Sequence, residues 1–184
     1  GFLDQVRRRL KGRSSELYLL GEVWEDASDK VSYGERRRYL LGGQLDGVMN
    51  YCWREALLEF IKAGDASLFK RRILTICDHY PAPALEAVMN PLSTHDVARA
   101  ATVLGVLRDV PEEQGDFVPL PEERERGRLG LKLAVLLQYV LPGIPSIYYG
   151  DEAGLFGFSD PWNRRCYPWG EEDEELIGFV KKLG

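Results

Sequence analysis

The chain has 184 residues, of which 45% are hydrophobic, 11% aromatic and 29% charged, a composition typical of a globular protein with its own core. This composition excludes disordered, collagen-like and disulfide-stapled proteins. The net charge of −5, from 24 Lys and Arg against 29 Asp and Glu, argues against a general phosphate-binding surface, so no nucleic-acid partner is expected.

Four short apolar runs predict buried strands at 17–21, 45–49, 87–92 and 144–149. None of them alternates polar and apolar residues, as a strand with one wet face would. Each run is followed by a helical pattern, and the gaps between runs fit strand-helix-strand units of about 30 residues or more. We therefore expect a parallel sheet built from consecutive β/α units.

Two of the intervening helices have a clear apolar pattern. One burying face is predicted on each, formed by Phe69, Ile73, Ile76, Cys77 and Tyr80 in the first helix and by Leu129, Leu133, Leu136, Leu137 and Val140 in the second. The second helix is expected to begin near Pro121 and to end before Pro142. Residues 109–120, which are rich in proline and acidic residues, predict a surface loop.

Consecutive parallel β/α units occur in open doubly wound sheets and in closed (β/α)8 barrels. A complete TIM barrel needs about 250 residues. The 184 residues of this chain fit half of such a barrel better than a whole one. No linker interrupts the sequence, so we expect one partial domain over residues 1–184.

The three cysteines, Cys52, Cys77 and Cys166, are odd in number and far apart. Neither a disulfide framework nor a zinc site is expected from them, and they are interpreted as buried free thiols. The longest apolar run, 133–149, is broken by Pro142 and by a second proline three residues later, so no membrane span is expected. We expect a cytoplasmic protein without membrane contact.

Polar residues follow the predicted strands, namely Glu22, Asn50, His95, Asp96, Asp151 and Glu152. The carboxyl ends of parallel strands meet at one edge, where α/β proteins bind their ligands. Aromatic residues also occur there, namely Trp24, Tyr51, Trp53, Tyr148, Tyr149, Trp162 and Trp169. Trp24 and Trp53 directly follow strand ends and are better placed for a ligand than for packing. Flat rings beside carboxylates and an amide indicate a carbohydrate site.

Each polar residue also has a structural interpretation. Glu22 can cap a helix or lie on the surface in an acidic cluster. The pair His95 and Asp96 can be hydrogen bonded within an ordinary loop. For Asp151 and Glu152 we favour capping or ion pairing that fixes the loop.

Four segments resemble, in order and spacing, the later strand motifs of the α-amylase family of glycoside hydrolases. They are LYLLGEVWEDAS (17–28), QLDGVMNY (44–51), NPLSTHDVAR (90–99) and GIPSIYYGDEAGL (143–155). The segment DPWNRRCYPW (160–169) resembles a loop of neopullulanase, cyclomaltodextrinase and oligo-glucosidase members. The resemblance implies a chain running from the fourth barrel helix to the start of the eighth, with about strands 5 to 8.

The resemblance also implies roles for eight residues. Glu22 matches the general acid/base of the family, Asp96 matches the carboxylate that stabilises the transition state, and His95 matches a substrate-binding histidine. The residues that match positions shaping sugar subsites are Trp24, Asn50, Arg99, Asn163 and Arg164. Glu25 stands where many relatives carry histidine, on the leaving-group side.

The chemistry implied is retaining cleavage of α-glucosidic bonds, in which two carboxylates lie about 5 to 5.5 Å apart and one attacks the anomeric carbon. Burial is expected to raise the pKa of Glu22 so that it carries a proton when needed. The attacking Asp of the family belongs to a GxRxD-like segment that these 184 residues lack. This polypeptide alone is therefore expected to be nearly inert.

No cofactor is expected, and no metal-ligand set is evident. The expected partners are an α-glucan or maltooligosaccharide and either a second copy or the missing amino-terminal half, because half a barrel exposes unpaired strand edges. The alternative function is a non-catalytic carbohydrate-binding or interaction module of the same fold. A third alternative, an open-sheet nucleotide-binding protein, has weak support, because no GxGxxG or GxxxxGK[ST] motif follows any predicted strand.

Overall fold

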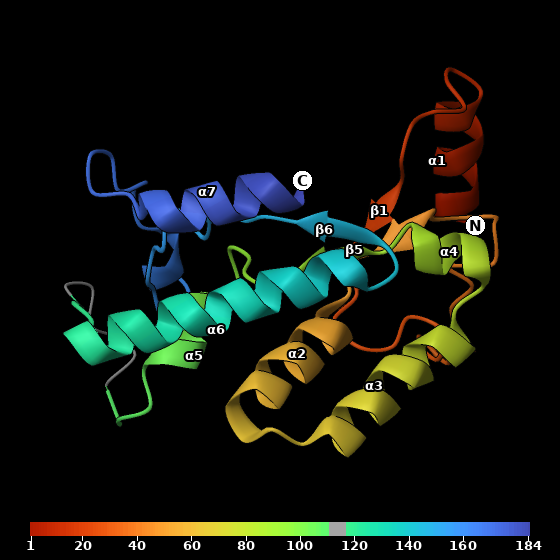
Figure 1. Cartoon of the computed structure of the whole chain (residues 1–184). Coiled ribbons are helices and arrows are strands. Elements are labelled where there is room, and N and C mark those ends of the chain that lie inside the picture. The colour runs from red at the N-terminus through yellow and green to blue at the C-terminus, as the bar shows by residue number, and fades with distance from the viewer. Residues whose placement is uncertain (111–116) are drawn as a thin grey trace. The chain divides into compact units, whose positions relative to one another are not determined.

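The computed structural model describes residues 1–110 and 117–184 (Figure 1). Its helices are α1 (Phe2–Lys11), α2 (Tyr51–Ala63), α3 (Ala66–His79), α4 (Ala82–Glu86), α5 (Ala100–Gly105), α6 (Pro121–Val140) and α7 (Glu174–Leu183), with a 3-10 turn at Trp162–Arg164. Its strands are β1 (Leu20–Gly21), β2 (Val31–Ser32), β3 (Glu35–Arg36), β4 (Gly47–Val48), β5 (Met89–Pro91) and β6 (Ile144–Ser146).

Backbone contacts divide the chain into two compact units, and each is built from three segments. The first unit comprises Gly1–Ala56, Asp65–Asn90 and Pro142–Pro145, and the second comprises Leu57–Gly64, Pro91–Leu141 and Ser146–Gly184. Neither unit is a continuous stretch of sequence. The expectation of a single domain therefore stays a prediction.

All four predicted strands are present, in shorter form, as β1, β4, β5 and β6. β1 and β4 pair in parallel, with Gly21 opposite Val48. A parallel bridge joins Met49, directly after β4, to Met89 at the start of β5. β5 also pairs with β6. The predicted parallel order is confirmed at the first two of these contacts.

A hairpin that the sequence did not predict lies between β1 and β4. β2 and β3 pair antiparallel, and the two residues that join them, Tyr33 and Gly34, have φ angles of 54° and 76°. Left-handed backbone at both positions is the geometry of tight two-residue hairpin turns. The usual sequence signal for such a turn is Asn-Gly or Asp-Gly, and a tyrosine in the first position does not provide it.

Asp46 attaches α1 to the rest of the first unit. Its carboxylate accepts a hydrogen bond from the Leu19 N–H at 2.9 Å and pairs with Arg7 at 2.8 Å and with Lys11 at 2.9 Å. Burial opposes ionisation of Asp46, but the hydrogen bond and the two cations outweigh it and lower its pKa. No side chain of α1 is buried within the described chain. Polar contacts, rather than apolar packing, therefore hold this helix.

In the second unit, two glycines bring the backbones of α5 and α6 unusually close. A Cβ atom added at Gly105 would lie 2.4 Å from the Glu123 carbonyl oxygen, and one at Gly127 would lie 2.6 Å from the Ala101 carbonyl oxygen. Neither distance is possible for a real Cβ, so only glycine fits at these two positions. The close approach buries Leu131 of α6 completely.

The predicted apolar face of α3 is confirmed in its central part, whereas that of α6 is wrong. Ile73, Ile76 and Tyr80 are buried. In α6, however, most of the expected face is exposed, including Leu129, Leu133, Leu136 and Val140. The buried residues of α6 are Glu123, Gly127, Leu131, Ala134, Val135 and Gln138. The physical reason is the close contact with α5, which requires the small residues Gly127 and Ala134 on the buried face, so the predicted leucines lie on the exposed side.

The predicted ends of α6 are confirmed, since the helix runs from Pro121 to Val140. Of the loop expected at 109–120, residues 111–116 lie outside the described chain, and the remaining positions form neither helix nor strand. No helix among the described residues has the length and apolar character needed to cross a membrane.

The cysteines are free, as predicted, but they are not all buried. Cys52 and Cys77 are partly buried, whereas Cys166 is exposed. Burial is the largest cause that raises the pKa of the Cys52 thiol, to about 11. Cys166 follows Arg165 in an irregular segment after the 3-10 turn.

We expect Gly127→Ala to lower the free energy of unfolding by about 1–3 kcal/mol, because the new methyl group would force α5 and α6 apart. The measurement is urea denaturation followed by circular dichroism.

Gly178→Ala in α7 is the matched control. A Cβ at Gly178 meets no atom within 4 Å, and alanine favours a helix interior by about 0.5–1 kcal/mol over glycine. This variant should be neutral or slightly more stable. Equal effects of the two substitutions would contradict the close-approach explanation.

Candidate active site

Glu22 and Trp24 follow β1 directly, in the first unit. Glu22 is exposed, so the burial expected around its carboxyl group is not found in this chain. Trp24 is 48% exposed and stacks on the buried ring of Tyr51, with 4.2 Å between ring centroids and 3° between their planes. Tyr51 therefore holds the indole by one face in a fixed orientation.

The loop that continues from Trp24 is held by two polar contacts. The Glu25 carboxylate pairs with Lys30, and this hydrogen bond lowers the pKa of Glu25. Asp26 pairs with His79 and accepts hydrogen bonds from Ser28. Burial opposes ionisation of Asp26, but these hydrogen bonds outweigh it, so its pKa is also lowered.

Asn50 has a structural role in this chain. Its side chain is 2% exposed, donates to the Asn90 Oδ1 atom at 3.2 Å and accepts from the Trp53 N–H at 3.3 Å. The Asn90 amide in turn donates to the Pro142 carbonyl at 2.8 Å. Asn50 therefore connects the end of β4 to β5, and its burial favours positioning over sugar contact. Trp53 is fully buried in the first turn of α2, so its prediction as a ligand contact is wrong.

In the second unit, Asp96 lies between the side chains of His95 and Arg164. His95 Nε2 is 3.1 Å from one carboxylate oxygen of Asp96, and Arg164 Nη2 is 3.5 Å from the other. Arg164 also donates from Nε to the His95 carbonyl at 2.9 Å and pairs with Asp160 at 2.9 Å. His95 remains 53% exposed and Asp96 30% exposed. The arrangement fixes the carboxylate and leaves it accessible to a ligand.

The side chain of Arg99, three residues after Asp96, is fully buried. Its guanidinium donates to the Tyr149 carbonyl at 2.7 Å, to Asp151 Oδ1 at 3.1 Å and to the Asn163 carbonyl at 2.9 Å. It also lies over the rings of Tyr148 and Tyr149, at 4.7 and 4.8 Å from their centroids. The ion-paired interpretation of Asp151 is thereby confirmed.

Asn163 links the contacts of Arg99 to the loop that contains Asp96. Its side chain is fully buried, and its Nδ2 atom donates to the Thr94 carbonyl at 3.1 Å and to the Val97 carbonyl at 2.9 Å. Since Arg99 and Asn163 are both buried, they are positioned to hold the loop that carries Asp96. Their predicted contact with a sugar stays a prediction.

The structure thus brings together five of the eight predicted site residues in the second unit, namely His95, Asp96, Arg99, Asn163 and Arg164. Glu22, Trp24 and Asn50 belong to the first unit. Within residues 1–110 and 117–184, no group of three or more His, Cys, Asp and Glu side chains is placed to hold a metal ion.

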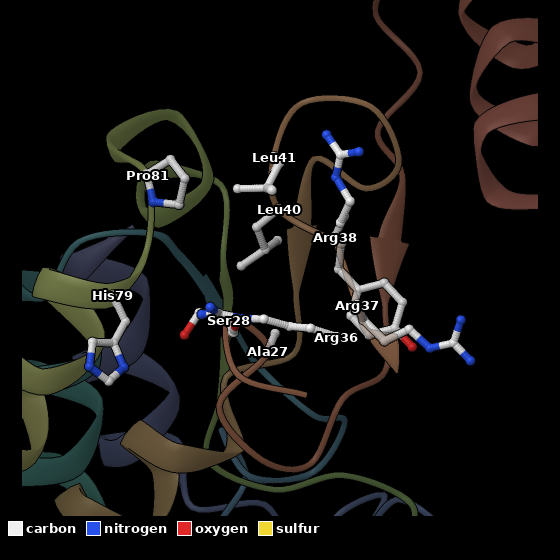
Figure 2. A pocket seen from close by; sticks show the side chains of 10 residues that line it. Ala27, Ser28, Arg36, Arg37, Arg38, Leu40, Leu41, His79 and Pro81 are labelled. Carbon is white, nitrogen blue, oxygen red and sulfur yellow. The ribbon is translucent and has the colours of Figure 1, made fainter. Parts of the chain in front are cut away.

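A separate cavity that the sequence did not predict lies in the first unit, with a volume of about 440 Å³. Its apolar part is formed by Ala27, Leu40, Leu41 and Pro81, and His79 lies at one side (Figure 2). None of the eight predicted site residues lines it. The cavity depends on the β2–β3 hairpin and its continuation, which the sequence pattern did not reveal.

We expect Arg99→Met to lower the free energy of unfolding by about 3–5 kcal/mol, because it leaves the Asp151 carboxylate buried without its cation. Burial is the largest cause that raises the pKa of Asp151, to about 6, and the charge of Arg99 opposes this rise. The folded pKa lies above the value of about 4 in an unfolded chain. Stability should therefore fall as pH rises from about 4, and in the variant the fall should extend to higher pH than in the parent.

The control is the double variant Arg99→Met/Asp151→Leu, which removes both charges. It should recover most of the lost stability and lack the pH-dependent fall caused by Asp151. Chemical denaturation between pH 4 and pH 8 measures both effects. Identical pH profiles of the single and double variants would show that Asp151 does not cause the pH-dependent fall.

The sequence matches the family described as "Alpha amylase, catalytic domain" over residues 1–179. Among curated relatives, an amylopullulanase of Thermoanaerobacter thermohydrosulfuricus is 38% identical over 177 residues, covering 90% of this chain and 11% of that protein. A cyclomaltodextrinase of Geobacillus thermopakistaniensis is 35% identical over 186 residues, covering 99% of this chain and 27% of that protein. The chain thus spans between 11% and 27% of the length of these relatives.

Solved structures agree with the sequence comparison. A Nostoc punctiforme debranching enzyme superposes with a TM-score of 0.78 at 30% identity, covering 100% of this chain and 36% of that one. A cyclic α-maltosyl-(1→6)-maltose hydrolase of Arthrobacter globiformis gives a TM-score of 0.76 at 28% identity, covering 99% and 36%. The chain belongs to the α-amylase family and has the TIM-barrel type of fold of its catalytic domain, with parallel strands and helices.

Proposed function

We propose that the chain is the carboxyl-terminal half, about strands 5 to 8, of the catalytic barrel of a retaining glycoside hydrolase acting on α-glucans. The observation that carries this proposal is Asp96, an accessible carboxylate held between His95 and Arg164 in the loop that follows β5. Glu22 is the first residue after β1. Relatives named amylopullulanase, cyclomaltodextrinase and neopullulanase support the substrate class.

In the proposed reaction, Glu22 gives a proton to the glycosidic oxygen as the bond to the anomeric carbon breaks. A carboxylate outside these 184 residues forms the new bond to that carbon. Glu22 then takes a proton from the water that releases the sugar. Asp96 binds sugar hydroxyls and stabilises the positive charge that develops on the ring, while His95 and Arg164 keep its carboxylate in position.

The proposal makes the chain nearly inactive by itself, since the covalent step needs the absent carboxylate. Exposed apolar side chains near β1 and β6 support a missing partner at the strand edges. Leu17, Tyr18 and Leu20 are 41%, 44% and 37% exposed, and Ile144 is 45% exposed. Apolar residues beside unpaired strand edges favour association with another chain.

A non-catalytic carbohydrate-binding module is the second candidate. It is favoured by the exposure of Glu22 and by Glu25 standing in place of the expected histidine. The two candidates differ in one outcome. The module would bind α-glucans without any turnover in the complete domain, and Glu22 would be replaceable.

We expect Glu22→Gln to lower turnover of an aryl α-maltoside by about 10²- to 10⁴-fold, the usual contribution of a general acid/base. The assay requires a complete catalytic domain. The chain is therefore grafted in place of the matching 186-residue stretch of the Geobacillus thermopakistaniensis cyclomaltodextrinase. For substrates whose leaving group needs no proton, the rate of glycosidic bond cleavage should fall much less.

Glu25→Gln is the matched control, because Glu25 is an exposed carboxylate three residues further along the same loop. It should retain activity within about tenfold, less than the smallest loss expected of a general acid/base. Folding of each graft is checked by its melting temperature. A folded, active graft in which both substitutions have equally small effects would remove Glu22 from the acid/base role.

We expect the isolated 184-residue chain to self-associate, most simply as a two-fold dimer formed through its strand edges. Sedimentation velocity over a hundredfold range of concentration measures this association. Replacing Leu20 by Lys should shift the equilibrium towards monomer, since a charge on an edge strand opposes pairing. A single monomeric species at every concentration would contradict the expectation.

A further inference from the structure

The loop after the 3-10 turn carries a pair of aromatic rings that the proposed reaction does not use. The rings of Tyr167 and Trp169 lie 4.5 Å apart between centroids, at 50° to each other. Trp169 is 81% exposed, whereas Tyr167 is partly buried. The pair therefore presents a broad, bent aromatic surface to the solvent, anchored through the tyrosine.

Backbone hydrogen bonds fix the shape of this surface. The Trp169 N–H donates to the Tyr167 carbonyl at 2.9 Å, and the Glu171 N–H donates to the Pro168 carbonyl at 2.9 Å. Gly170 has a φ of 82°, which closes the turn in a conformation that few other residues adopt. A ligand that stacks on these rings would not have to order them first, which lowers the entropic cost of binding.

The base of the loop is also held in place. The Tyr149 hydroxyl donates to the Arg165 carbonyl at 2.9 Å, and the Arg165 guanidinium donates to the Phe117 carbonyl at 2.9 Å. Tyr149 belongs to the framework around Arg99. The aromatic pair is thus attached to the same rigid part of the second unit that carries Asp96.

The groups around the pair indicate the chemistry of its ligand. Burial, followed by the negative charges of Glu152, Glu172 and Glu174, raises the pKa of Tyr167. One oxygen of Glu152 is buried and has no hydrogen-bond partner among the described residues. Carboxylates accept hydrogen bonds from hydroxyl groups and repel anions. Rings beside acceptor oxygens therefore suit a neutral ligand with apolar faces and hydroxyl edges.

We propose that Tyr167 and Trp169 form a platform for one glucosyl unit of an α-glucan, in addition to the sugar bound at Asp96. The identity of the ligand rests on the proposed function. The loop that bears the platform also carries Arg164, the partner of Asp96. A glucan long enough to reach beyond Asp96 is therefore the natural occupant, and the platform should favour long substrates over short ones.

The experiment compares the affinities of the full 184-residue chain for maltoheptaose and maltose by isothermal titration calorimetry. Trp169→Ala should weaken binding of maltoheptaose about 3- to 10-fold, as expected for loss of one aromatic stacking contact, and should leave the affinity for maltose within about twofold. Trp169→Phe retains a flat ring and should restore most of the affinity. Tyr33→Ala is the matched control, since Tyr33 is a 95% exposed aromatic residue of the first unit.

A second measurement does not depend on the binding affinity of a variant. The chain has four tryptophans, so its nitrogen-15 spectrum contains four indole N–H signals, and Trp169→Phe identifies one of them. Maltoheptaose should shift that signal in the parent chain. An unshifted signal, or equal loss of maltose and maltoheptaose affinity in Trp169→Ala, would overturn the platform.

The two proposals fail in different ways. If the graft is active and depends on Glu22, but Trp169→Ala binds maltoheptaose like the parent, only the platform is wrong. If the indole signal shifts with maltoheptaose while every folded graft is inactive, the platform stands and the catalytic assignment is wrong.

Discussion

The candidate site of the second unit depends on the contacts of one buried group, the Arg99 guanidinium. A permanently charged group loses its hydration when it is buried, so its surroundings must supply both charge and acceptors. Asp151 supplies the charge, and the carbonyls of Tyr149 and Asn163 supply acceptors. These partners come from separate segments of the chain, and the Arg99 side chain joins them. The position of Asp96 follows, because Asn163 holds the loop on both sides of it.

Close backbone contacts complete this framework. α5 and α6 approach at Gly105 and Gly127, and the helix that bears Arg99 at its amino end is thereby fixed against the longest helix of the chain. In the first unit, Gly47 has the same function, since a Cβ there would lie 2.1 Å from the Ala87 carbonyl oxygen. Both units therefore contain positions at which only glycine fits.

The sequence pattern predicted the strands well, because strands covered on both faces are largely apolar, as β4 is, although β5 also contains the buried Asn90. It failed for the buried face of α6, because helix packing through Gly127 and Ala134 leaves no hydrophobic signal while the exposed leucines leave a strong one. The resemblance predicted the residue types of the candidate site. It did not reveal that Arg99 and Asn163 are buried, because polar residues are ordinarily found at the surface.

The discontinuous composition of the first unit has a consequence for synthesis on the ribosome. Its last segment, Pro142–Pro145, provides the Ile144 N–H that bonds the Val88 carbonyl and the Pro142 carbonyl that accepts from Asn90. The unit therefore stays incomplete until more than fifty further residues have been translated. Throughout that interval the side of β5 that pairs with β6 has no partner, and an unpaired strand edge favours wrong association of a nascent chain.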